Sequence, residues 1–206
     1  MLDQMIIGFD KIIKTLFLEP QTKREIPGSN LPDADLSDSE KKHVVSLMRV
    51  NHCGEVCAQA LYMGQALTSR SAESRTEFEN ASKEEEEHLA WTLDRIHELG
   101  GRTSILNPLF YFGALTMGIG AGILGDRWNL GFLRETEIQV GKHLKEHLTK
   151  LPIQDLKSIA IIEQMAIDEN RHAQMAKSNG AVELPHIAKV GMRALSKVMT
   201  NTTYYL

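Results

Sequence analysis

The chain has 206 residues, enough for one domain with a full core and too few for two comfortable ones. Hydrophobic residues make up 42% and charged residues 24%, as in ordinary globular proteins, and aromatic residues are scarce at 6%, which favours helix. The 23 basic and 27 acidic residues give a net charge of −4, which argues against a nucleic-acid partner because phosphate binding usually requires a basic surplus. We therefore treat residues 1–206 as a single domain.

The first 35 residues form an amphipathic and then irregular segment. Charges at Asp3 and Asp10 interrupt the apolar residues, so we expect no signal peptide. Apolar residues still recur there at helical spacing: Ile6, Phe9, Ile13, Leu16 and Phe17. A stretch rich in Pro, Gly and Asp over residues 20–38 predicts a surface segment, ended by a helix N-cap at Ser37 or Ser39.

Four long helical patterns follow. They are expected at about residues 40–67, 72–99, 129–148 and 154–177, with Gly or Pro near the end of the last three. A shorter helix is expected over residues 186–199. These elements predict an all-α fold: a ferritin-like four-helix bundle with an extra C-terminal helix.

The two cysteines, Cys53 and Cys57, lie four residues apart on one face of the first long helix. Redox and zinc motifs of the C-x-x-C type need another spacing, and a disulfide does not normally join positions i and i+4 of a helix. We expect two small buried apolar residues in a protein of the reducing cytoplasm.

The connection between the second and third long helices, over residues 102–127, is long and apolar. Residues 105–124, ILNPLFYFGALTMGIGAGIL, contain no charge. Twenty such residues are long enough to span a bilayer, but Pro108 and the glycines weaken a simple spanning helix. We therefore expect this crossover to lie in the membrane interface.

One chemical unit occurs twice: a lone Glu on one helix, followed by Glu-x-x-His on the next. The lone Glu precedes the pair by 30 residues in the first unit and by 32 in the second. The six residues are Glu55, Glu85, His88, Glu137, Glu169 and His172. Residues i and i+3 are neighbours on a helix, so each pair can offer a carboxylate and an imidazole to one ion, as in ferritin-like di-iron proteins.

Helical phase selects these residues from the other acids. Glu169 and His172 lie in the middle of an apolar stripe, where a charge is costly unless it is paired or bound to metal. In the acidic run 84–87, Glu85 shares the apolar face, and the other three point roughly 100–200° away from it. Asp168 faces about 100° away from the stripe of Glu169.

The six residues suit a pair of divalent ions. Four carboxylates balance the charge of two Fe(II), which leaves two neutral imidazoles, and such donors suit iron or manganese better than zinc or copper. His52 shares the face of Glu55, and we interpret it as a core or outer residue in preference to a direct ligand. His143, six residues after Glu137, is interpreted as a surface or hydrogen-bonding residue.

The motifs around these residues resemble the bacterial demethoxyubiquinone hydroxylase family. They are NHCGEVCAQALYMGQAL, EEEEHL, ETEIQVGKHLKEHL and IDENRHAQMA, and the similarity runs from Leu36 onward. The resemblance implies that the six residues bind two irons, which use O2 to hydroxylate the ring of a polyprenylated demethoxybenzoquinol in ubiquinone biosynthesis. It also implies that His143 lies near the substrate. Electrons would come from NADH or through the quinol itself.

A lipid-tailed quinol also fits the apolar crossover, because an enzyme that acts on its ring must reach the bilayer interface. We therefore expect a peripheral protein on the cytoplasmic side of the cell membrane. A helper lipid-binding or ubiquinone-biosynthesis protein and a homo-oligomer are the further partners considered.

Three alternatives remain. A ferritin-like iron oxidation or storage protein would need a polar, cage-forming exterior, which the apolar crossover opposes. A di-iron tRNA hydroxylase would be expected to have a basic surface. A metal-free structural bundle would not bury four Glu residues.

Overall fold

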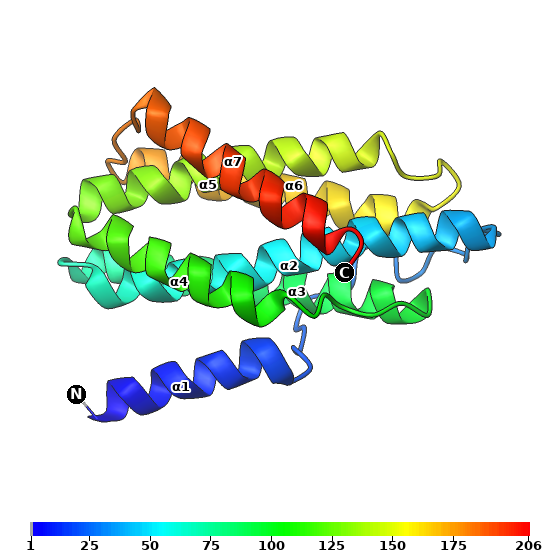
Figure 1. Ribbon diagram of the computed structural model, residues 1–206, viewed down its shortest axis with the longest axis horizontal. Helices are drawn as coiled ribbons and strands as arrows, with labels where there is room; N and C mark the ends of the chain where they lie inside the picture. The colour runs from blue at the N-terminus through cyan, green and yellow to red at the C-terminus, as the bar shows by residue number, and fades with distance from the viewer. Residues whose placement is uncertain (1) are drawn as a thin grey trace.

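The computed structural model describes the backbone of residues 2–206 and the side chains from residue 8 onward, so Met1 and the side chain of Ile6 lie outside the described part. Within it the chain forms seven helices and no strand (Figure 1). The helices are α1 (Leu2–Phe17), α2 (Asp38–Thr68), α3 (Ala72–Glu98), α4 (Asn107–Ile123), α5 (Asp126–Leu148), α6 (Leu156–Ser178) and α7 (His186–Thr203). The all-α prediction is confirmed.

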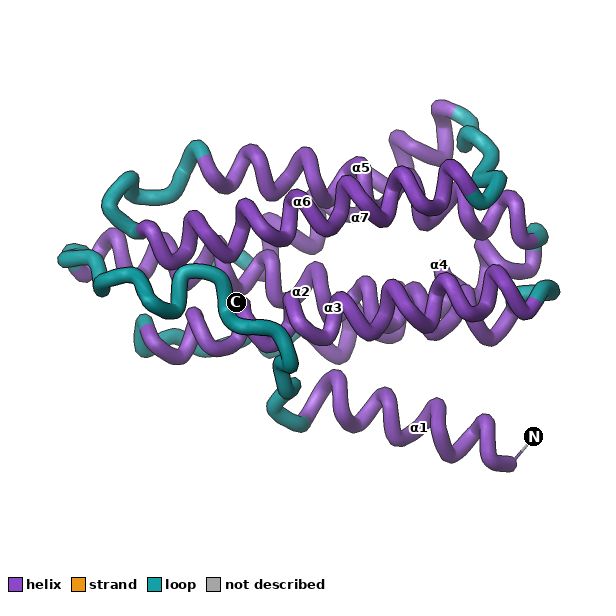
Figure 2. The backbone as a smooth tube through the Cα atoms, turned by 180° about the vertical axis from the view of Figure 1, so that it is seen from behind, coloured by secondary structure: helices purple, strands orange, loops and turns teal. Residues whose placement is uncertain are grey.

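Apart from α1, the helices are stacked in layers. Figure 1 draws α4 and α7 in front of α2 and α5, and Figure 2, seen from behind, draws α3 and α6 in front. The most extensive contacts join α2 to α3, α2 to α4 and α5 to α6. Helices α2, α3, α5 and α6 are thus the predicted ferritin-like four-helix bundle, α4 and α7 cover one side of it, and α1 lies along its edge (Figure 1).

Side-chain caps set where several helices begin. Of the two predicted caps before α2, Ser37 is the correct one: its Oγ accepts from the backbone N–H of Glu40 at 3.4 Å, and the Glu40 carboxylate accepts from the N–H of Ser37 at 2.8 Å. Helix α5 begins at Asp126, three residues before its predicted start. Gly125, with φ of 105°, turns the chain there, a conformation that costs glycine little.

The apolar crossover is itself a helix, α4, which packs along α2. The two backbones approach closely through glycines: a Cβ at Gly118 would lie 2.2 Å from the carbonyl oxygen of Leu61, and one at Gly64 would lie 2.6 Å from that of Leu115. Tyr111 and Ala114 on the inner face of α4 are buried, whereas the large side chains of its outer face are exposed: Leu109, Phe112, Met117 and Ile123.

Over residues 2–206, no helix combines the length and the apolar character that crossing a membrane requires.

The core is divided along the bundle axis into two apolar clusters. One contains Val56, Phe78 and Leu133, and the other contains Leu47 and Ile162, each with their neighbours. Cys53 is buried and Cys57 is partly buried beside the first cluster, and both thiols are free. On α2, α5 and α6 a short band of buried polar residues lies in sequence between the two clusters, and on α3 the buried polar residues lie between Ala81 and Leu89, near the end of the first cluster.

Replacing Gly118 by Ala should destabilise the protein, because the new methyl group meets the α2 backbone, which cannot yield as a flexible side chain would. We expect a loss of about 1–3 kcal/mol in the free energy of unfolding, measured by urea denaturation. Gly120→Ala is the matched control on the same helix, since a Cβ there meets nothing within 4 Å. An equal response of both variants would contradict the close packing of α4 on α2.

Candidate metal centre

All six predicted residues meet in the polar band between the two core clusters. They form two overlapping groups, and within each group one potential ligand atom per residue lies within 4.8 Å of the others. The groups are Glu55, Glu85, His88 and Glu169, and then Glu85, Glu137, Glu169 and His172. Because both groups contain Glu85 and Glu169, these two carboxylates are placed to bridge two metal positions.

The orientation of the donors fits a pair of divalent ions. Nδ1 of His88 lies 2.8 Å from the Glu85 carboxylate, and Nδ1 of His172 lies 3.1 Å from its other oxygen, so the same nitrogen of each ring faces the centre. Oε1 of Glu85, Oε2 of Glu169 and Nδ1 of His172 are buried without an aligned hydrogen-bond partner among the described residues. Divalent cations between these atoms would satisfy all three.

The pKa values describe how the centre balances charge without metal. Burial and the neighbouring carboxylates raise the pKa of Glu55 and that of Glu137 well above the ordinary value. Burial alone would lower the pKa of both histidines, but the shared carboxylates raise the pKa of His88 well above normal and that of His172 to about 12. Two neutral acids, two carboxylates and two imidazoliums therefore sum to zero, as four carboxylates with two divalent ions would.

Comparison with known proteins assigns the chain to a family. The sequence model of the family described as ubiquinone biosynthesis protein COQ7 matches residues 42–203, which include all six residues. The chain belongs to the COQ7 family. It is 57% identical over 206 residues, 100% of both chains, to the 3-demethoxyubiquinol 3-hydroxylase of Laribacter hongkongensis. Relatives with the same name from Chromobacterium violaceum (56% over 204 residues, 99% of both chains) and Nitrosomonas europaea (54% over 205 residues, 100% of this chain and 99% of the relative) are also similar.

In this COQ7-family chain a second carboxylate contacts the outer nitrogen of each histidine. Asp168 Oδ2 lies 3.1 Å from Nε2 of His88, and Glu84 Oε2 lies 2.9 Å from Nε2 of His172. Glu84 directly precedes Glu85 on α3 and contacts His172 on α6. Asp168 directly precedes Glu169 on α6 and contacts His88 on α3, so the two contacts cross between the helices. Carboxylates in this position orient the imidazole and hold its outer proton.

Sequence reasoning missed these two outer acids. Phase correctly excludes Glu84 and Asp168 from the ligand face, but the chain folds so that each reaches the neighbouring helix. A signal was present, because both repeats read acid-Glu-x-x-His, at residues 84–88 and 168–172. Tyr62 is likewise not singled out from the sequence, although its hydroxyl donates a hydrogen bond to the Glu137 carboxylate.

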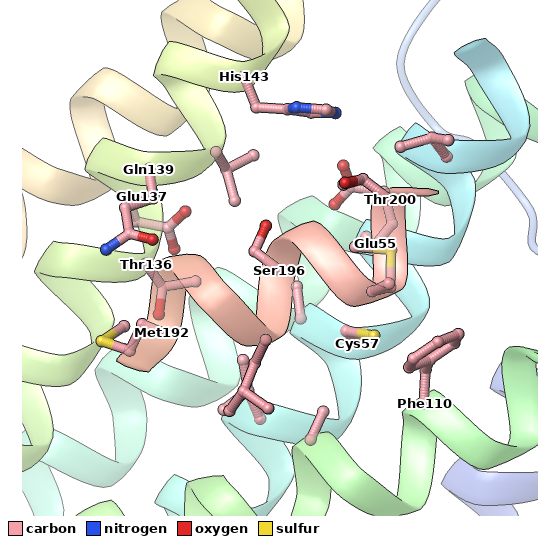
Figure 3. Close-up of a pocket in the computed structure, with 18 of the residues that line it drawn as sticks. Glu55, Cys57, Phe110, Thr136, Glu137, Gln139, His143, Met192, Ser196 and Thr200 are labelled. Atoms are coloured by element: carbon pink, nitrogen blue, oxygen red, sulfur yellow. The ribbon is translucent and has the colours of Figure 1, made fainter. Parts of the chain in front are cut away.

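A cavity of about 410 Å³ adjoins the centre. Residues of α2, α4, α5 and α7, with Glu169 of α6, line it, and most of them are apolar. Figure 3 shows α7 beside it, with Glu55 and Glu137 among its lining. His143 is partly buried and also lines this cavity, and its proximity to a substrate stays an expectation from the family resemblance. Burial lowers the pKa of His143 to about 4, so its imidazole is neutral at physiological pH.

His52 is placed as the sequence favours. It is buried and belongs to neither ligand group, and burial lowers its pKa to about 4. It is therefore a neutral core histidine.

Metal binding should release protons, because the metal-free centre holds two on imidazoliums and two on carboxylic acids. We expect about four protons for two Mn(II) at pH 7, measured by titration in weakly buffered solution. Since protons compete with the metal, affinity should rise with pH and fall on acidification. The exposed-acid variant Glu86→Ala should release the same number. Release of fewer than about two protons would contradict the assigned protonation states.

Proposed function

We propose that the chain is a 3-demethoxyubiquinol 3-hydroxylase with two iron ions held by the six residues of the centre. The observation that carries this proposal is the position of the buried Glu and His cluster at the wall of an apolar cavity, in a chain whose full-length relatives carry that name. When bound, the iron pair would supply O2 activation and insertion of one oxygen atom into the quinol ring. Iron is preferred to manganese because the reaction consumes O2.

The protein would supply a binding site, orientation and exclusion of water. The cavity seats an aromatic ring against the centre, where Glu55, Glu137 and Glu169 form part of its wall. The neutral His143 can accept a hydrogen bond from a ring hydroxyl, because its pKa of about 4 leaves a ring nitrogen unprotonated at pH 7. Tyr62 fixes the orientation of Glu137 through its hydrogen bond.

The cavity and the relatives favour a hydroxylase over the alternatives. Iron oxidation and storage requires passage of ions and needs no apolar cavity of about 410 Å³ beside the metals. The relatives found are named for a quinol hydroxylase, which is neither an iron-storage protein nor an enzyme acting on tRNA. NADH as the electron donor, a helper lipid-binding protein and self-association stay predictions of the sequence.

Iron-loaded protein should convert a reduced demethoxyubiquinone analogue to the product heavier by one oxygen atom, with 18O from 18O2, as measured by mass spectrometry. Glu85→Ala should lose the iron and the activity together, because removal of a bridging ligand leaves the other buried charges unbalanced. Glu86→Ala, on the exposed face one residue later, should retain both. Iron-loaded wild-type protein that oxidises Fe(II) but leaves the quinol unchanged would favour the storage alternative.

We further propose that the protein is peripheral to the cytoplasmic side of the cell membrane and contacts it through α4 and α7. Helix α4 exposes Leu109, Phe112 and Ile123, and α7 exposes Ile187 and Leu195. The two helices form one layer of the molecule and both line the cavity, so a polyprenyl tail could pass from the bilayer to the centre between them (Figures 1 and 3). Exposed apolar patches of this kind mark membrane or partner surfaces.

Changing Leu109, Phe112 and Ile123 together to Ser should release the protein from liposomes in a flotation assay. Each large apolar side chain withdrawn from the interface removes roughly 1.5–3 kcal/mol of transfer free energy. Leu115 is left unchanged because it packs against the core. Turnover of a long-tailed quinol should fall, while that of a short-tailed soluble analogue should persist.

The control replaces Ile153 and Ile167, exposed by 86% and 62% outside this layer, with Ser. It should leave liposome binding unchanged. Equal loss of activity on long-tailed and short-tailed substrates would show that the α4 residues support the cavity and not membrane contact.

A further inference from the structure

Residues 22–24, here called the N-terminal strap, are fastened to α3 next to the metal centre. The carboxylate of Glu87 accepts hydrogen bonds from the Thr22 hydroxyl and from the backbone N–H groups of Lys23 and Arg24, the latter two at 3.0 and 3.2 Å. Nε1 of the buried Trp91 donates to the Thr22 hydroxyl at 3.3 Å. The strap precedes residues 42–203, the region that the family sequence model matches, so nothing in that match assigns it a role.

Arg24 extends from the strap to the outer side of His88. Its Nη1 lies 2.8 Å from Oδ2 of Asp168, the same oxygen that lies 3.1 Å from Nε2 of His88. Its guanidinium carbon lies 4.7 Å from the centre of the Trp91 ring, and that ring lies 5.2 Å from the His88 ring. Arg24 therefore holds both the carboxylate that faces the imidazole and the aromatic ring beside it.

The corresponding contact on the other side of the centre is held less firmly. The side chain of Asp168 is 4% exposed, whereas that of Glu84, which contacts His172, is 38% exposed. Arg171 contacts both acids but is itself 57% exposed. The two repeats thus supply equivalent ligands, and Arg24 is an addition on the His88 side alone.

We propose that Arg24 is a positioning residue for the metal position that His88 serves. Through Asp168 it fixes the His88 imidazole, and it makes the two positions of the centre unequal in affinity and electronic environment. The proposal rests on the proposed function only in requiring that the centre binds two irons.

The test is an anaerobic titration of the metal-free, full-length protein with Fe(II), in which calorimetry measures the heat of binding. Wild-type protein should bind two equivalents. In Arg24→Gln one equivalent should weaken by about tenfold, as expected when an outer partner of a histidine ligand is lost, while the other changes little. In Mössbauer spectra of 57Fe-loaded protein, the quadrupole splitting of one iron should change and that of the other should stay.

Three comparisons separate positioning from general stability. Lys23→Gln removes the same charge from the adjacent exposed residue, keeps the backbone contact with Glu87, and should match wild type. Arg24→Lys should recover part of the affinity, because it restores the charge without the planar fork. Adding Arg24→Gln to Asp168→Asn should cause no further loss, since Arg24 acts through Asp168.

Equal weakening of both equivalents, additive losses in the double variant, or an unchanged titration of Arg24→Gln would overturn the inference. Wild-type protein that binds no iron would overturn the proposed function as well, so the two failures are distinguishable.

Discussion

The structure depends on keeping four carboxyl groups and two imidazoles buried in the middle of a helical bundle. Each residue of the centre is at most 3% exposed, and an isolated charge at such a depth would unfold a domain of marginal stability. The centre avoids this cost in two ways that are electrically equal. The raised pKa values favour protons on Glu55, Glu137 and the two histidines when no metal is bound, and two divalent ions would replace those protons.

The same constraint accounts for the layers around the bundle. A centre accessible on every side would be hydrated, so each side of it is covered by a different element. Helices α3 and α6 cover it from behind with the crossed carboxylates, and the N-terminal strap lies over the His88 side. Only the side toward α4 and α7 contains the cavity, whose lining is mostly apolar. Access to the centre is therefore directed toward the layer with exposed apolar residues, which is the arrangement that a lipid-soluble substrate would require.

The bundle and the six residues at its centre could be predicted because both follow from local periodicity. Helical phase alone distinguishes Glu85 from three neighbouring Glu residues, and the structure places Glu85 in both ligand groups. The crossed contacts of Glu84 and Asp168 depend on how α3 packs against α6, and Arg24 reaches Asp168 across 144 residues of chain. Contacts of this kind between distant segments produce no periodic pattern in the sequence. The packing of α4 was missed for a related reason, since its glycines suggest a broken helix until α2 is seen against them.

The repeated unit also shows which residues could make the two metal positions differ. Two copies of the acid-Glu-x-x-His motif would provide two nearly equivalent metal positions, with Glu85 and Glu169 common to both ligand groups. A reaction that adds a single oxygen atom to a ring does not treat two metal positions alike, because the ring approaches from one side. In this chain the cavity reaches the centre past Glu55 and Glu137, while the elements outside the repeats differ at the two histidines. Residues around the ligands can make the two positions unequal, and Arg24 is one such residue: it contacts Asp168 beside His88 alone, whereas Arg171 contacts both Asp168 and Glu84.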